Sequence, residues 1–358
     1  MINLAYTSIR PGQTWLDTDG NRIQAHGCNI IIEDDIFYWY GTHKAKRSSV
    51  SDDWQLQTRF YASRDLYNWE YKGNMIYPEN PESIFKNNSE HFPCARIIYN
   101  RRTGKYVAWG TYADDYTLPQ SPYSFALCAM TSDSLMGPYT FVNDMHPFGM
   151  SAQFGDYAVD RQDGKGYLIF TRAHSELIIA DLTEDFTNVT GHYSAHFPRV
   201  APPYVREAPA YFYRRGKHYL FTSGTTSWFP NPSEVAMAET YHGPWTVLGD
   251  AHRNDPSRTS FNSQIFTVLR HPGKKDLYIA LADRHLPRLP EQYPEEFNNG
   301  RFYSRVEKYM NTSKTDLPIG KLYENVITGT EYVWLPVRFD GETPYIEWLD
   351  EWRFEDFD

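Results

Sequence analysis

Residues 35–41 read DIFYWYG, and the chain repeats this kind of segment four more times. Each copy places a Gly or Asp turn before a run of aromatic and branched residues: GKYVAWG from Gly104, GKGYLIF from Gly164, GKHYLFTS from Gly216 and GKKDLYIALAD from Gly273. A tight turn followed by such a run predicts a hairpin whose strand is buried on at least one face. The turns are about 50 to 70 residues apart, a spacing typical of propeller blades. The five segments therefore predict five similar units.

A second repeat follows the first and consists of a polar turn before an aromatic strand. Its copies are SRDLYNWEYKG (63–73), TSDSLMGPYTFV (131–142), AETYHGPWTVL (238–248) and the looser ADLTEDFTNVTG (180–191). An inner hairpin cannot cover its own apolar face, so each unit needs an outer hairpin as well. We predict an all-β fold, a five-bladed β-propeller with four antiparallel strands in each blade.

The composition is that of one large β-domain. The repeats run through most of the 358 residues, and no Ser/Gly linker or charged block separates them, so we predict a single domain over residues 1–358. Aromatic residues make up 16% of the chain, including 28 Tyr and 10 Trp. Such rings suit packed sheets, and they also suit sugar binding, because the C–H faces of a sugar ring stack on aromatic rings.

Charge and cysteine content exclude several classes of protein. The formal net charge of -10 and the lack of a Lys/Arg cluster disfavour nucleic acid as a partner. Cys28, Cys94 and Cys128 are an odd number without metal-type spacing, which predicts reduced thiols rather than a disulfide framework. The N-terminus has no signal-peptide pattern, and no apolar stretch is long enough for a bilayer. We expect a soluble cytoplasmic protein without a membrane partner, although a signal removed beforehand would leave the same sequence.

Polar residues occur about ten residues before each hairpin turn, where the innermost strand of a blade lines the central funnel. Ionisable groups on such apolar strands are costly unless they are paired or used. The predicted funnel positions are Gln24 and His26, Pro93 and Cys94, Asp156, Glu207, and Gln264. Two carboxylates and two amides are therefore expected to converge.

Glu207 is the strongest candidate for an acid. It lies in VREAPAYFY (205–213), where burial among rings would raise its carboxyl pKa toward neutrality, the condition for protonating a leaving oxygen. The alternative is a simple salt bridge to Arg206 or another basic residue. Asp156 either orients and tunes Glu207 or caps the turn leading into AVDRQDGKG (158–166).

At these segments the chain resembles glycoside hydrolase family 43, the five-bladed β-propeller glycosidases, and in particular its branch of exo-β-1,3-galactanases. The resemblance covers nearly the whole length and rests on six segments in order. They are IQAHGCNII with FYWYG, RIIYNRRTGKYVAW, FGDYAVDRQDGKGYLIF, REAPAYFYRRGKHYLFTSGTTSWFPNP, FNSQIFTVLRHPGKKDLYIALADR and YVWLPVRFDGETPYIEW.

The resemblance implies an inverting hydrolase with Glu207 as general acid and Asp156 as the residue that adjusts its pKa and holds it. Most of the family carries an Asp base on the first blade, where this chain has Gln24, as the galactanase branch does. In place of that Asp base, the branch that this chain resembles has a Gln or Glu on the fifth blade, and the corresponding residue here is Gln264. An amide is a very poor base, so Gln264 either acts through an imidic-acid tautomer relayed by neighbours or positions the attacking water.

The second blade departs from the branch. Where the branch typically has Glu-Arg-Pro-Lys, this chain has residues 93–96, Pro-Cys-Ala-Arg. The missing Glu would be expected to bind a substrate hydroxyl, which puts galactose recognition in doubt. Glu90 or His91 would substitute if the loop is rearranged. Cys94 is interpreted as a small packed residue rather than a nucleophile, because no base stands beside it.

Further candidates have two interpretations each. His26 either faces the funnel, contacting sugar or an axial ion such as calcium, or is a buried structural histidine. Arg284 has a functional interpretation, in which it holds a sugar hydroxyl or pairs with Asp156 or Glu207. The alternative is an ion pair on the surface. No other cofactor is expected.

Two loops complete the set of candidates. Trp228 provides either a stacking platform or rim packing, in a loop shaped by Asn231 and Pro232. DTDGN (17–21) is interpreted as a turn, because position twelve of a calcium loop would be Cys28 rather than Glu.

Three functions are therefore compatible with the sequence. The first is exo-acting, inverting hydrolysis of a galactan, most simply as a galactan β-1,3-galactosidase acting on arabinogalactan-type side chains. The second keeps the fold but changes the sugar, as an α-L-arabinofuranosidase or β-xylosidase, because fold does not determine substrate. The third is a non-catalytic sugar-binding propeller that has lost its base. In each case the partner is an oligosaccharide or polysaccharide.

Overall fold

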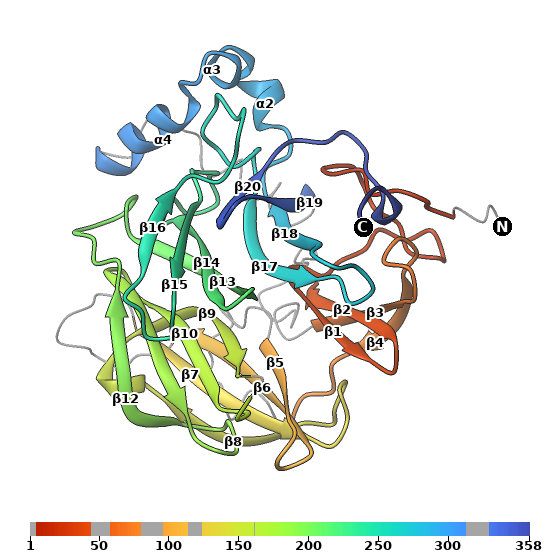
Figure 1. The fold of residues 1–358 in the computed structure, drawn as a ribbon, viewed down its shortest axis with the longest axis vertical. Coiled ribbons are helices and arrows are strands. Elements are labelled where there is room, and N and C mark those ends of the chain that lie inside the picture. The colour runs from red at the N-terminus through yellow and green to blue at the C-terminus, as the bar shows by residue number, and fades with distance from the viewer. Residues whose placement is uncertain (1–4, 44–57, 80–95, 114–123, 161, 313–328) are drawn as a thin grey trace.

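The computed structural model describes residues 5–43, 58–79, 96–113, 124–160, 162–312 and 329–358. Its strands form five separate sheets of four strands, and neighbouring strands in each sheet are antiparallel. Figure 1 shows the sheets arranged around a common centre. This confirms the predicted five-bladed β-propeller.

Each blade is formed by four consecutive strands. The first contains β1 (His26–Glu33), β2 (Ile36–Thr42), β3 (Thr58–Ser63) and β4 (Glu70–Asn74). The second contains β5 (Arg96–Asn100), β6 (Lys105–Ala113), β7 (Phe125–Ser132) and β8 (Thr140–Met145). The third contains β9 (Ala152–Val159), β10 (Gly166–Arg172), β11 (Glu176–Leu182) and β12 (Val189–His196).

The last two blades follow the same order. The fourth contains β13 (Arg206–Arg214), β14 (Lys217–Gly224), β15 (Glu234–Ala238) and β16 (Thr246–Gly249). The fifth contains β17 (Gln264–Arg270), β18 (Tyr278–Arg284), β19 (Glu331–Asp340) and β20 (Thr343–Ile346). Short helical segments are η2 (Pro147–Gly149), α2 (Leu289–Gln292), α3 (Pro294–Asn298), α4 (Phe302–Asn311) and η3 (Phe354–Asp356).

The turns predicted from the repeated hairpins occur between the first two strands of each blade. Gly104, Gly164 and Gly216 have φ values of 68°, 71° and 86°, in the left-handed region that glycine adopts without steric cost. The first blade uses Asp34 and Asp35 instead, at 49° and 60°. Asp is among the few other residues that tolerate this conformation, which explains the Asp in place of Gly at this turn.

The helices were not predicted from the sequence. α2, α3 and α4 occupy the connection between β18 and β19 and lie together at the edge of the molecule (Figure 1). Their apolar side chains pack on the loop after β14 in a cluster of Phe229, Leu286, Leu289, Phe302, Tyr303, Val306 and Tyr309, with Trp228 at its border. The helices therefore pack beside Trp228.

The ring is closed between the first and fifth blades by side-chain packing and by the N-terminal segment, in which the backbone N–H groups of Ile9 and Gly12 donate to the carbonyls of Trp352 and Tyr332. All four strands of the fifth blade come from the C-terminal part of the chain, so no N-terminal strand completes that sheet. Trp39 of β2 and Trp334 of β19 are fully buried, with ring centroids 4.6 Å apart, and Trp69 packs on both. Buried Trp pairs of this kind contribute about 0.5–1.5 kcal/mol each beyond their area. Part of the aromatic content of the sequence thus serves to close the ring.

The described helices include none that is long and apolar enough to cross a membrane.

Candidate active site

Glu207 lies on the innermost strand of the fourth blade, at an irregularity of that strand. Glu207 pairs with Ser223, but the next paired residue is Ala210, opposite Phe221, which marks a β-bulge. Ala208 within the bulge has φ 48°, and Pro209 cannot donate to the ladder. Bulges re-aim side chains and are common beside active sites. The Ala-Pro pair after Glu207 therefore determines where the carboxyl group points.

The Glu207 carboxyl group is buried, with 8% of the residue exposed. Burial raises its pKa from 4.5 to about 7, and interactions with Thr225, Gln264 and Arg206 oppose this shift only in part. The salt bridge to Arg206 is not formed. Arg206 Nε instead lies 3.5 Å from Glu234, and the guanidinium donates to Thr222. Glu207 is therefore a buried acid whose pKa lies near neutrality.

This burial predicts a pH-dependent cost in stability. Because the folded protein holds the Glu207 proton up to about pH 7 and the unfolded chain releases it near 4.5, stability should fall as pH rises between these values. A shift of this size corresponds to roughly 3 kcal/mol. We expect Glu207→Gln to gain stability over the parent chain at pH 8 but little at pH 4.5, as measured by chemical denaturation. An equal difference at both pH values would contradict the assigned burial cost.

Gln264 joins the fourth and fifth blades at the carboxyl group. Its Nε2 donates to Ser223 Oγ at 2.6 Å and to Glu207 Oε1 at 3.4 Å. Its Oε1 lies 3.1 Å from His285 Nε2. The amide is thereby held in one orientation, with its nitrogen toward the acid and its oxygen toward an imidazole.

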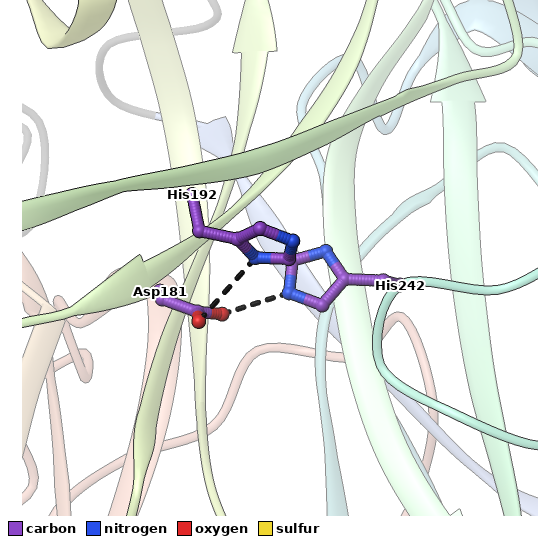
Figure 2. Close-up of side chains that lie close together, drawn as sticks. All are labelled: Asp181, His192 and His242. Carbon is purple, nitrogen blue, oxygen red and sulfur yellow. Dashed lines mark hydrogen bonds and ion pairs between the residues drawn. The ribbon is translucent and has the colours of Figure 1, made fainter.

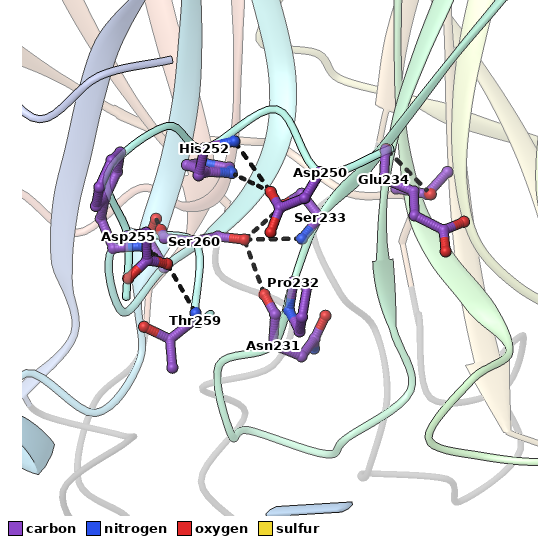
Figure 3. A network of polar contacts seen from close by, with 12 residues as sticks. Asn231, Pro232, Ser233, Glu234, Asp250, His252, Asp255, Thr259 and Ser260 are labelled. Atoms are coloured by element: carbon purple, nitrogen blue, oxygen red, sulfur yellow. Dashed lines mark hydrogen bonds and ion pairs between the residues drawn. The ribbon is translucent and has the colours of Figure 1, made fainter. Parts of the chain in front are cut away.

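The loop before Gln264 is held by a buried polar network (Figure 3). Asp255 accepts the backbone N–H groups of Thr259 and Phe261, and Ser260 Oγ donates to the Asn231 carbonyl at 2.8 Å. Ser260, Phe261 and Asn262 all have positive φ, between 55° and 58°. These hydrogen bonds offset the backbone strain and place Gln264 at the start of β17. Asn231 shapes its own loop too, because its side chain bonds Gly224 and Thr226.

Asp156 lies on the innermost strand of the third blade and reaches the strand of Glu207. Its Oδ2 accepts the backbone N–H of Tyr211 at 2.8 Å, and its Oδ1 accepts that of Tyr157. Burial raises its pKa, and the charge of Arg96 opposes the shift. Asp160 caps the following turn by accepting from Gln162, so the capping role suggested for Asp156 is wrong. Asp156 anchors β13 four residues after Glu207.

Gln24 and His26 form a pair on the first blade. His26 Nε2 lies 2.8 Å from Gln24 Oε1, and the His26 ring stacks on Tyr332. His26 is only 1% exposed, and its Nδ1 lies 3.6 Å from Asp283, which itself accepts the Gly27 N–H. These contacts match the interpretation of a buried histidine. A calcium ion needs six to eight oxygen ligands, and the described residues bring no group of three carboxylate or imidazole ligands together here.

Of the two remaining described candidates, Arg284 ends β18 of the fifth blade and Trp228 lies on the loop after β14 of the fourth. Arg284 donates to the Phe261 carbonyl at 3.0 Å and lies over the Trp348 ring, and burial lowers its pKa to about 10. The ion pair with Asp156 or Glu207 suggested above is not formed. Trp228 is half-buried and meets His285 edge-on at 4.9 Å. Trp228 therefore borders the residues that hold Gln264. Glu90, His91, Pro93 and Cys94 lie outside the described residues.

Three residues of the site were not identified from sequence. Ser223 faces Glu207 across the hairpin, His285 holds the Gln264 oxygen, and Arg96 donates to the Phe266 carbonyl while acting on Asp156. Counting from the turn at Gly216 places Gly224 opposite Glu207, and only the bulge at Ala208 and Pro209 brings Ser223 there, so spacing along the chain did not identify Ser223. His285 stands next to Arg284 in ADRHLPR, but nothing local distinguishes it.

The arrangement has the chemistry of a glycosidase. A carboxyl group with a pKa near neutrality can donate a proton to a glycosidic oxygen, and flanking amides can bind sugar hydroxyls or water. Glu207 and Gln264 lie at the start of the innermost strands of adjacent blades and contact each other, so one substrate can reach both.

The comparison with protein families identifies the class. The profile of glycosyl hydrolases family 43 matches residues 26–290, so the chain belongs to this family of inverting glycoside hydrolases. The resemblance found in the sequence is thereby confirmed. Comparison with curated protein sequences gave no match.

Solved structures of the same family have a similar fold. A GH43 β-1,3-galactosidase has a TM-score of 0.74 and 26% identity, over 98% of this chain and 64% of its own. A second, determined with galactodeoxynojirimycin, has a TM-score of 0.73 and 25% identity, over 97% and 100%. An exo-β-1,3-galactanase from Phanerochaete chrysosporium has a TM-score of 0.71 and 24% identity, over 96% and 68%. This chain thus spans about two thirds of the length of two of these three proteins.

Proposed function

We propose that this chain is an exo-acting, inverting galactan β-1,3-galactosidase that acts on arabinogalactan-type side chains. The observation that carries the proposal is the buried Glu207 carboxyl group, with its pKa raised to about 7 beside Gln264. The two family members named as β-1,3-galactosidases support the choice of sugar and linkage.

In the proposed reaction, Glu207 donates its proton to the glycosidic oxygen as the bond from that oxygen to the anomeric carbon breaks. Water attacks the anomeric carbon from the opposite face, which gives a product of inverted configuration. The proton that the water loses passes to the nitrogen of Gln264 in the imidic-acid form, and the Gln264 Oε1–H passes its own proton to His285 Nε2. Asp156 is a positioning residue in this scheme. By holding the Tyr211 N–H, it keeps β13 and the bulge at Glu207 in place.

Gln264 is the proposed partner of the water, and its amide lies close to the acid in the absence of substrate. Acid and base of an inverting glycosidase stand about 6.5–9.5 Å apart, whereas Gln264 Nε2 is 3.4 Å from Glu207. No sugar ring fits between groups at that distance. We therefore infer that the entering galactosyl ring displaces this weak hydrogen bond, while Ser223 and His285 continue to hold the amide. His285 is the neighbour through which an imidic-acid relay to Gln264 Oε1 would pass.

A panel of oligosaccharides tests the proposed substrate. We expect release of galactose from β-1,3-galactan oligosaccharides, and we expect proton NMR of the first product to show the α-anomer, because inversion of a β-linkage gives it. Arabinan and xylan oligosaccharides should remain intact. Release of arabinose or xylose instead would assign the alternative sugars of the same family, and a β-anomer as first product would contradict inversion.

A further inference from the structure

Three metal-ligand side chains meet on the outer part of the propeller, where the third and fourth blades adjoin. Asp181 comes from β11, His192 from β12, and His242 from the turn between β15 and β16 (Figure 2). His242 Nε2 lies 2.7 Å from Asp181 Oδ1, and His192 Nδ1 lies 3.4 Å from Asp181 Oδ2. One ligand atom from each residue lies within 4.8 Å of the other two.

These distances suit a small divalent cation. Zinc binds imidazole nitrogen and carboxylate oxygen at about 2.0–2.2 Å, so neighbouring ligand atoms in a tetrahedral site are about 3.3–3.5 Å apart. The 3.4 Å from Asp181 Oδ2 to His192 Nδ1 matches this value, whereas the 2.7 Å from Asp181 Oδ1 to His242 Nε2 is a hydrogen-bond distance that would have to lengthen by about 0.6 Å to admit the ion. The His192 side chain is 65% exposed, so its ring is free to rotate by the small amount that would bring the third ligand into place.

A serine behind His242 can hold that ring as a metal ligand. Ser194 Oγ lies 2.7 Å from both His242 Nδ1 and His196 Nε2. A serine hydroxyl donates only one hydrogen, so at least one of these rings must donate to it. In the metal-free protein the 2.7 Å contact with Asp181 Oδ1 needs a hydrogen on His242 Nε2. A metal ion would replace that hydrogen, and Nδ1–H would then donate to Ser194 Oγ. Metal-bound histidines nearly always donate their second ring N–H in this way.

The local packing keeps the blades close at this point. Tyr241, the neighbour of His242, stacks on Tyr167 of β10 with ring centroids 3.8 Å apart. Lys165 Nζ lies 2.7 Å from Asp181 Oδ2 and competes with a metal for that oxygen. The Lys165 side chain is 44% exposed and can move into solvent.

We propose that Asp181, His192 and His242 form a binding site for a first-row divalent cation such as Zn²⁺, with water as the fourth ligand. Two imidazoles and one carboxylate suit zinc better than calcium or magnesium, which prefer oxygen ligands. The ion joins two strands of the third blade to a turn of the fourth. Its role is to hold these blades together, since none of its ligands belongs to the Glu207 site.

Titration of the untagged full-length chain with Zn²⁺ by calorimetry tests the site. We expect one Zn²⁺ per chain, and with Co²⁺ as a probe a visible absorption band of four-coordinate geometry. Loss of an outer partner of a metal site weakens binding about 10- to 100-fold, so His192→Ala and His242→Ala should each weaken Zn²⁺ binding at least as much. Lys165→Met should tighten binding, because it removes the competing cation.

A matched control separates this site from general histidine binding. His271→Ala changes a histidine in the turn of the fifth blade and should leave Zn²⁺ affinity unchanged. Circular dichroism should show that the exposed His192→Ala variant folds like the parent chain. Absence of Zn²⁺ binding, or binding that both His192→Ala and His242→Ala leave intact, would overturn the proposal.

Discussion

Replacing Glu207 by Gln should lower kcat on β-1,3-galactan oligosaccharides about 10³-fold, within the range of about 10²- to 10⁴-fold for a positioned proton donor. The substitution keeps the size of the side chain and its hydrogen bond to Gln264, so KM should change little. Steady-state kinetics on the trisaccharide measures both values. The loss should arise from the missing proton alone.

A change of leaving group tests this explanation directly. A dinitrophenyl β-galactoside needs no protonation of its leaving oxygen, so the Glu207→Gln variant should hydrolyse it nearly as fast as the parent enzyme does. Glu239→Gln is a matched control, because Glu239 is exposed and pairs with Lys217 on the surface. Activity close to that of the parent enzyme on the unactivated trisaccharide would show that Glu207 is not the acid.

The assignment of Glu207 as general acid also predicts how kcat/KM depends on pH. Since Glu207 must be protonated to act, kcat/KM should fall as pH rises through about 7, where the carboxyl group loses its proton. This alkaline limb should be absent for the dinitrophenyl substrate.

Replacing Gln264 by Ala should lower kcat about 10²-fold or more, because the water or its relay loses its partner. Gln24→Ala is the matched comparison, since Gln24 Oε1 is also held by an imidazole, that of His26. A larger loss for Gln24→Ala would assign the water to the first blade. Activity of Gln264→Ala equal to that of the parent enzyme would remove Gln264 from the reaction.

Gln264→Glu provides a second test of the same residue. A carboxylate at this position would stand beside Glu207, and two neighbouring carboxyl groups hold a shared proton more tightly. The alkaline limb of the pH profile should therefore move to higher pH, while activity is retained in part. An unchanged profile would mean that residue 264 turns away from Glu207 in the working enzyme.

Much of the fold could be predicted because its signals are local. The glycine turns at 104, 164 and 216 and the aromatic runs after them lie within a few residues of each other, and all three produced the expected hairpins. The helices at 289–311 escaped prediction for the opposite reason. They are short, and their stability comes from packing on Phe229 and Trp228, which are about 60 residues or more away in sequence.

In the candidate site, too, the positions along the strands could be predicted from sequence, but the side-chain partners could not. Counting back from each turn brought Asp156, Glu207 and Gln264 to neighbouring inner strands, as the period of the strands requires. It did not show that Arg284 packs on Trp348, or that Arg206 pairs with Glu234. Side-chain partners depend on strands from other blades, and spacing along the chain does not encode them.

The sequence alone determined the number of blades, the strands within them and the inner positions of the polar residues, since these follow from turn chemistry and the alternation of side chains along a strand. Only the tertiary structure decided that Glu207 is buried beside Gln264, and that Asp181 meets His192 and His242 across two blades. Burial and distance between blades arise from packing of the closed ring, so the pKa of Glu207 and the proposed metal site belong to the folded protein.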